Sequence, residues 1–111
     1  MILGKVVGSV WGGKEAQSLE SAKLLNVQPV RFLSGASPVR VNQEKDVPLS
    51  DDVIVALDRL GAGVGEYVLV AHGSRVRDIT VGRRFPTKEV VVAIVDSCEV
   101  DSSLFPEEKQ E

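Results

Sequence analysis

Short apolar runs separated by turn-forming residues are the dominant pattern along this chain, and they predict strands. Residues 2–11 alternate loosely between apolar and polar positions around Gly4 and Gly8, which we expect to mark a bend or a bulge in a first strand. Residues 23–33 predict a second strand, in which Pro29 limits pairing because proline has no N–H to donate to a ladder. Bends of this kind are typical of barrels.

The rest of the chain adds further strands. Residues 53–60 and 66–72 are rich in valine and leucine and flank a glycine-rich connection. Residues 90–95 form a continuous apolar run whose β-branched side chains favour a strand over a helix, because branching at Cβ restricts the helical χ1 rotamer. A short additional strand is expected at residues 39–41. The pattern therefore predicts five or six strands.

Three polar segments separate or follow these strands. Residues 34–52 carry a glycine, two prolines and several charges, and they predict a long excursion, the least ordered interior part of the chain. Residues 73–84 are polar, carry four arginines and predict a loop. Residues 101–111 form an acidic tail, and we expect its last five residues to be disordered.

The length and the strand count together indicate the fold class. A chain of 111 residues fits one domain and buries roughly two-thirds of the surface that its unfolded form exposes. Short strands without a convincing long helix or an internal repeat predict an all-β fold, a small five- to six-stranded closed or nearly closed β-barrel of the oligonucleotide-binding type. We expect this barrel domain to span residues 1–100.

The glycine-rich connection at residues 61–65 is the most distinctive motif. A phosphate-binding glycine loop opens a helix, so that backbone N–H groups face the anion. Here the residues that follow, from Glu66 onward, predict a strand, and Glu66 stands where a dinucleotide-binding pattern needs its third glycine. The motif therefore favours a tight connection between strands over a nucleotide site.

Charge and cysteine content narrow the setting. The formal net charge is −3, with 16 acidic against 13 basic side chains, so the whole chain does not attract nucleic acid or anionic lipid. Cys98 is the single cysteine and has no partner for a disulfide or a zinc site, which favours a reducing, cytoplasmic location. No signal peptide or apolar run near 18 residues appears, so no membrane contact is predicted.

Candidate catalytic residues do not form a convincing set. His72 is the only histidine, and Ser74 lies two residues away, but the pair lacks the setting of a known hydrolase motif. Asp58, Glu66 and Asp96 are carboxylates at strand ends, where they more often accept backbone N–H bonds or pair with arginines. We therefore predict no catalytic site, no metal and no cofactor.

The arginines of residues 75–84 leave one alternative open. A barrel of this size with a basic loop can act as a monomeric single-stranded nucleic-acid-binding module. Such modules combine the basic groove with aromatic side chains on which bases stack, and no aromatic residue is interleaved with Arg75, Arg77, Arg83 and Arg84. Nucleic-acid binding remains the second hypothesis.

The order of several short motifs carries a family resemblance. Val55-Ala56, Asp58 and the run from Gly61 to Glu66 form the strongest element. Supporting elements are the start Gly4 to Val10, Lys23-Leu24-Leu25 with Val27, Gly73-Ser74 with Arg77, and Pro86 leading into Val91 to Asp96. With these motifs the chain resembles the bacterial microcompartment vertex proteins of the EutN/CcmL family. The resemblance covers most of residues 2–96.

This resemblance implies a structural protein rather than an enzyme. It implies a homo-pentamer at the vertices of a polyhedral microcompartment shell in the cytoplasm, beside hexameric or trimeric shell proteins. Serine at 21, valine at 76 and lysine at 88 depart from the family pattern and leave the compartment type open.

The resemblance also implies roles for particular residues. A narrow opening along the five-fold axis is expected, and the residues that we expect to approach it are Gly61, Ala62, Gly63, Val64 and Gly65. The alternative is that these residues only shape a turn. The residues expected to make structural or intersubunit polar contacts are Asp58, Glu66, Ser74 and Arg77, with a Glu66–Arg77 ion pair or backbone capping as the specific hypotheses.

Overall fold

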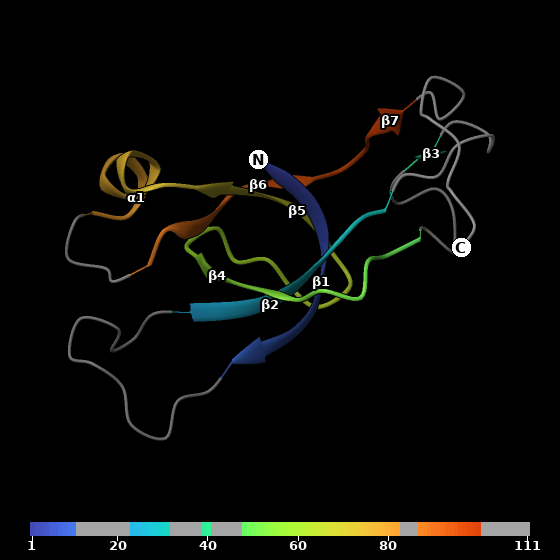
Figure 1. Ribbon diagram of the computed structural model, residues 1–111, viewed down its shortest axis with the longest axis horizontal. Coiled ribbons are helices and arrows are strands. Elements are labelled where there is room, and N and C mark those ends of the chain that lie inside the picture. The colour runs from blue at the N-terminus through green and yellow to red at the C-terminus, as the bar shows by residue number, and fades with distance from the viewer. Residues whose placement is uncertain (11–22, 32–38, 41–47, 83–86, 101–111) are drawn as a thin grey trace, which may run out of the picture.

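Five strands close into a barrel in the order β1-β2-β4-β6-β5 (Figure 1). The computed structural model describes residues 1–10, 23–31, 39–40, 48–82 and 87–100. The barrel strands are β1 (Ile2–Val10), β2 (Lys23–Pro29), β4 (Ile54–Asp58), β5 (Tyr67–His72) and β6 (Glu89–Val95). Neighbouring strands are antiparallel, except that β4 meets β6 in parallel at Leu57 and Val90. The predicted small closed barrel is confirmed.

The glycines of β1 produce the bend that the sequence predicts. The register against β2 shifts between Val6 and Gly8, so Val7 is an extra residue in the bulge. Gly4 is required for a different reason: a Cβ there would overlap Val27 Cγ1 and lie 3.0 Å from the carbonyl oxygen of Gln28. The two strands therefore approach more closely than any side chain at position 4 permits.

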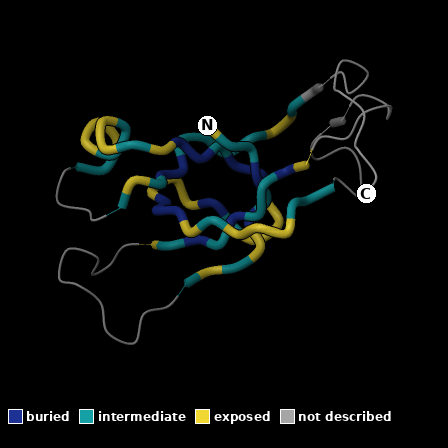
Figure 2. The backbone as a smooth tube through the Cα atoms, in the orientation of Figure 1, coloured by how far each residue is buried: buried dark blue, intermediate teal, exposed yellow. Residues whose placement is uncertain are grey.

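Alternate residues of the strands fill the barrel interior. This core consists of Val6, Leu25, Val27, Ala56, Ala62, Val68, Val70 and Val91, all buried (Figure 2). Each fully buried valine or leucine stabilises the fold by about 1.5–3 kcal/mol relative to exposure. Ala62 is the member that does not come from a strand. It brings the glycine-rich connection into the barrel core.

A second apolar cluster lies around Tyr67 and Val30. Leu3, Leu49, Val95 and Cys98 pack against this pair. Val30 follows β2 and forms a bridge with Leu49, while the carbonyl of Pro29 accepts a hydrogen bond from the N–H of Ser50 at 2.8 Å. β2 therefore ends at Pro29, earlier than the predicted residue 33, and the chain exchanges hydrogen bonds with the segment that leads toward β4.

The prediction of a loop after β5 was wrong. Instead of a loop, Ser74–Thr80 form a short helix, α1. Gly73 precedes it with φ of 132°, and its carbonyl accepts the first helical bond from Arg77 N at 3.1 Å. No glycine or proline lies between Gly73 and Gly82, so no residue of this polar segment breaks the two helical turns.

Two very short strands pair outside the barrel. β3 (Val39–Arg40) pairs antiparallel with β7 (Glu99–Val100), so the predicted strand at 39–41 is present, while β7 was not predicted. The rest of the predicted excursion at 34–52 is described only from residue 48 onward. Trp11, Arg83, Arg84 and the tail at 101–111 lie outside the described residues.

Candidate functional site

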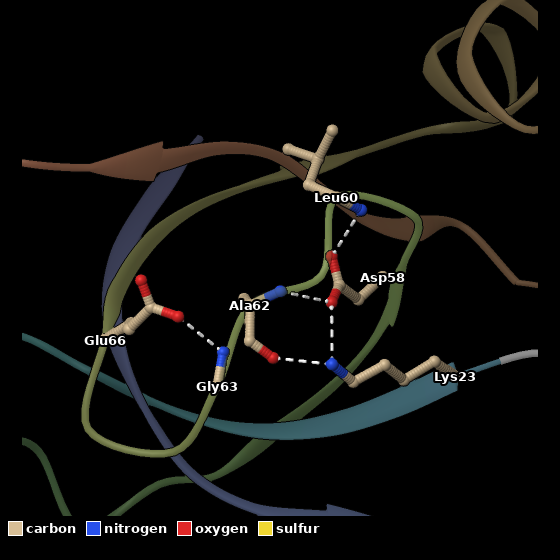
Figure 3. A network of polar contacts seen from close by, with 6 residues as sticks. All are labelled: Lys23, Asp58, Leu60, Ala62, Gly63 and Glu66. Atoms are coloured by element: carbon tan, nitrogen blue, oxygen red, sulfur yellow. Dashed lines mark hydrogen bonds and ion pairs between the residues drawn. The ribbon is translucent and has the colours of Figure 1, made fainter.

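The connection between β4 and β5 is the best-organised polar feature of the described chain (Figure 3). It runs from Asp58 to Glu66 and contains the motif singled out in the sequence. Two carboxylates, one at each end, bind backbone N–H groups within it. We call residues 58–66 the clamped loop.

Asp58 holds the first half of the clamped loop. Its side chain is fully buried, Oδ1 accepts a hydrogen bond from Leu60 N at 2.9 Å, and Oδ2 accepts one from Ala62 N at 2.8 Å. A buried carboxylate is costly unless its oxygens are paired, and these backbone donors meet that need. They also explain why β4 ends at Asp58 instead of continuing to residue 60 as predicted.

Lys23 completes the pairing of Asp58 from the neighbouring strand. The two residues are directly opposite in the β2–β4 register, and Lys23 Nζ lies 3.5 Å from Asp58 Oδ2. The same ammonium group donates to the carbonyl oxygen of Ala62 at 2.6 Å. Lys23 therefore neutralises the buried carboxylate and fixes the loop backbone at once.

Glu66 holds the second half of the loop, and β1 anchors it. Glu66 Oε1 accepts a hydrogen bond from Gly63 N at 2.7 Å. Gly65 N donates to the carbonyl of Val6 at 2.8 Å, and Val6 N donates to the carbonyl of Glu66 at 2.9 Å. Figure 3 shows these polar contacts on both sides of the loop, those of Asp58 and Lys23 on one side and that of Glu66 on the other. The backbone from 58 to 66 is thus held at several points.

The glycines of the clamped loop serve its backbone conformation. Gly61 has φ of 86° and Gly65 has φ of 94°, a region that side-chain-bearing residues rarely adopt, although a Cβ at either position would meet open space. Ala62 points into the core, whereas Leu60 and Val64 are 51% and 68% exposed. The loop therefore holds two apolar side chains in water in the single chain.

Ser74 and Arg77 lie on α1, away from the clamped loop in sequence. Ser74 is the exposed first residue of the helix, and Arg77 Nε donates to Asp78 Oδ1 at 3.2 Å. Glu66 contacts Gly63 within the loop. The predicted pair of Glu66 with Arg77, within or between subunits, therefore stays a prediction.

His72 and Ser74 do not form the arrangement of a nucleophile with its base. His72 Nδ1 contacts Glu89 Oε1 across the β5–β6 ladder, where the two residues are register partners. Among the described residues no group of three or more His, Cys, Asp or Glu side chains has a geometry suited to a metal ion. The described helix is too short and too polar to cross a membrane.

Sequence reasoning named Asp58, Glu66 and the glycines but missed the role of Lys23. Lys23 was named from the sequence only as part of a motif that supports the family resemblance. A strand register was needed to see that Lys23 faces Asp58, and no periodicity in a single sequence gives the register between strands far apart in the chain.

Comparison with known proteins places this barrel in a family. Residues 1–96 match the family described as ethanolamine utilisation protein EutN/carboxysome. The chain belongs to the EutN/CcmL family. It is 33% identical over 102 residues to the carboxysome shell vertex protein CcmL of Synechococcus elongatus, covering 92% of this chain and 90% of that protein. It is also 36% identical over 101 residues to the bacterial microcompartment shell vertex protein PduN of Salmonella typhimurium, covering 87% and 97%.

Solved EutN/CcmL structures share the fold. The pentameric microcompartment shell protein GrpN from Rhodospirillum rubrum superposes with a TM-score of 0.68 at 31% identity, covering 90% of this chain and 99% of that chain. These family members are named as shell proteins or shell vertex proteins. The comparisons therefore favour a structural role over nucleic-acid binding.

Proposed function

We propose that this chain is a structural shell protein that assembles as a homo-pentamer and occupies the vertices of a bacterial microcompartment in the cytoplasm. The observation that carries the proposal is the match of the whole barrel to a pentameric shell protein, at 31% identity and a TM-score of 0.68. The family match over residues 1–96 supports it independently.

The physical basis of this role is closure. A flat layer of six-fold tiles cannot form a closed polyhedron, so units of five-fold symmetry are needed at the corners. A cyclic pentamer uses one heterologous interface, repeated until the ring closes. Such a subunit needs a rigid barrel and two surfaces that fit each other, and it needs no catalytic group.

Hexameric or trimeric shell proteins of the same compartment are the proposed neighbours of the pentamer. Electron microscopy of shells assembled with and without this chain tests the vertex role. Closed polyhedra are expected with the chain, and open or elongated shells are expected without it. Closed polyhedra of the same shape in both samples would contradict the proposal.

The clamped loop is the segment that we place near the five-fold axis. Small residues from 61 to 65 let neighbouring backbones approach closely, and Val64 stands out from the loop with 68% of its surface exposed. The hydrogen bonds from Asp58 and Glu66 keep this segment in one conformation, as a narrow opening requires.

Gly63 offers a test of this placement. A Cβ at Gly63 would lie 3.3 Å from Glu66 Oε1, a contact that a small shift of the side chain relieves. The Gly63→Val variant should therefore fold, and its branched side chain should narrow or distort the axial opening, as a structure of the assembled variant will show. A pentamer with unchanged axial geometry would contradict the placement.

A further inference from the structure

α1 buries none of its side chains in the single chain. The helix has seven residues, and none of them is buried (Figure 2). Ile79 is 75% exposed. Isolated helices of this length are marginal in water, because most helical stability in proteins comes from burying an apolar face. The side chain of Ile79 is therefore accessible to a partner outside the single chain.

α1 packs against β6 and β5, and two of its side-chain hydrogen bonds stay within the helix. Thr80 Oγ1 donates to the carbonyl of Val76 at 2.6 Å, and Arg77 Nε donates to Asp78 Oδ1 at 3.2 Å. Arg75 is exposed, and within the described parts of the chain its guanidinium has no hydrogen bond or ion pair. The outer surface of α1 therefore combines an apolar side chain with a cation that no described residue pairs.

A matching surface of opposite charge precedes β4. Asp51, Asp52 and Val53 are all exposed, and 53% of the surface of Val53 is open to water. The backbone N–H of Asp52 donates to Ser50 Oγ, and neither carboxylate has an ion pair with any described residue. Two acids beside an exposed valine thus complement an arginine and an exposed isoleucine.

The two surfaces lie on different sides of the barrel. Figure 1 shows α1 at one end of the view and the segment that leads into β4 on the other side of the strands. The two surfaces of one chain therefore do not contact each other. Two complementary surfaces on separate sides of one subunit are what a head-to-tail ring requires.

We propose that α1 of one subunit docks on residues 51–53 of the next copy of this chain, with Ile79 against Val53 and Arg75 facing Asp51 and Asp52. This inference rests on the proposed ring of identical subunits and specifies which surfaces form its repeated contact. Apolar burial supplies affinity, and the charges set orientation and register. The salt dependence of assembly is then modest, since only the exposed charges are screened.

Charge exchange tests this contact directly. Native mass spectrometry and light scattering over a protein dilution series will compare the wild type, Arg75→Asp, the double variant Asp51→Arg with Asp52→Arg, and the triple variant that combines them. Each charge reversal is expected to raise the protein concentration needed for assembly by about tenfold or more, because like charges then face each other. The triple variant restores opposite charges and is expected to recover assembly.

The apolar half of the contact needs its own variant and control. Ile79→Asp is expected to weaken assembly, whereas Lys88→Asp, an exposed charge reversal outside α1 and outside residues 51–53, is expected to leave it unchanged. Circular dichroism checks that each barrel is folded. Because these positions are exposed in the single chain, loss of the fold is not expected.

The outcomes separate the contact from the pentamer. A wild type that assembles while the Arg75→Asp and Ile79→Asp variants assemble equally well overturns the α1 contact and leaves the ring intact. Failure of the triple variant to recover assembly also overturns the proposed pairing of charges. A wild type that remains monomeric overturns the proposed function itself.

Discussion

Lys23 and Asp58 face each other across β2 and β4, and their charged atoms lie 3.5 Å apart. The carboxylate is buried, while the lysine side chain is 46% exposed, so the pair joins the core to the surface. Through this pair the glycine-rich connection is attached to a strand more than thirty residues earlier in the chain. The conformation of the clamped loop is therefore a property of the barrel and not of the loop alone.

Removing the ammonium group should loosen the clamped loop. Lys23→Met keeps most of the apolar stem but leaves Asp58 without its counter-charge and Ala62 without its 2.6 Å hydrogen bond. The free energy of unfolding is expected to fall by about 1–2 kcal/mol, less than for a fully buried pair, because water reaches the lysine position. Urea denaturation at fixed protein concentration measures this loss.

Lys23→Arg is the matched control for this variant, because it retains the positive charge and donors. It is expected to lose less stability than Lys23→Met. Hydrogen exchange adds a local readout, in which the amide of Ala62 should exchange faster in Lys23→Met while amides of β5 stay protected. Equal stability and exchange in both variants and the wild type would contradict the role of Lys23.

The positive φ at Gly65 should make it intolerant of a side chain. With φ of 94°, alanine at this position is expected to cost about 1–2 kcal/mol, although the Cβ itself would meet open space. Gly8→Ala is the control, since its Cβ would lie 3.6 Å from Asn26 Nδ2, an ordinary contact, without positive φ. Thermal denaturation of both variants will compare them, and equal loss of stability would show that conformation is not the cause.

Glu66 should contribute differently depending on where it lies in the assembly. In the single chain it is exposed and accepts one hydrogen bond from Gly63 N, so Glu66→Gln, which keeps an acceptor, should be close to neutral. Glu66→Ala is expected to cost about 0.5–1.5 kcal/mol of stability. Native mass of the alanine variant checks its second role: a large loss of assembly indicates a contact buried between subunits, and unchanged assembly removes Glu66 from that interface.

Ionisation of Tyr67 should lower the free energy of unfolding at alkaline pH. Burial raises the pKa of the phenol above its ordinary value of 10.0, so the folded state holds the proton more tightly than the unfolded chain. Stability from this group is therefore complete below pH 10 and falls as the pH rises through the raised pKa. Urea denaturation between pH 8 and pH 11 should show this slope, and Tyr67→Phe should reduce it. An unchanged slope in Tyr67→Phe would assign the effect to other groups.

The strands of the barrel were predictable because their residues alternate or cluster in ways that helices do not tolerate. Residues 66–72 and 90–95 correspond to β5 and β6 within one residue at each end. The ends of β2 and β4 were predicted too long, because the hydrogen bonds that end these strands leave no mark in the apolar pattern. The carbonyl of Pro29 accepts a hydrogen bond from Ser50 N. The carboxylate of Asp58 accepts hydrogen bonds from the loop that follows it.

The helical conformation of α1 and the role of Lys23 could not be predicted from the sequence, for related reasons. Arg75, Arg77 and Asp78 give the helix segment a polar composition without an apolar stripe, so no helical periodicity marks it. Lys23 is one of many charged residues until the β2–β4 register brings it to Asp58. Both features depend on contacts outside their own segment, with Asp58 for Lys23 and with β6 and β5 for α1.

The native mass of the purified chain, measured by native mass spectrometry at low and high ionic strength, tests the central claim most directly. A pentameric shell protein held mainly by apolar burial should show a single species at five times the subunit mass under both conditions. A monomer at both ionic strengths would contradict the pentameric vertex role.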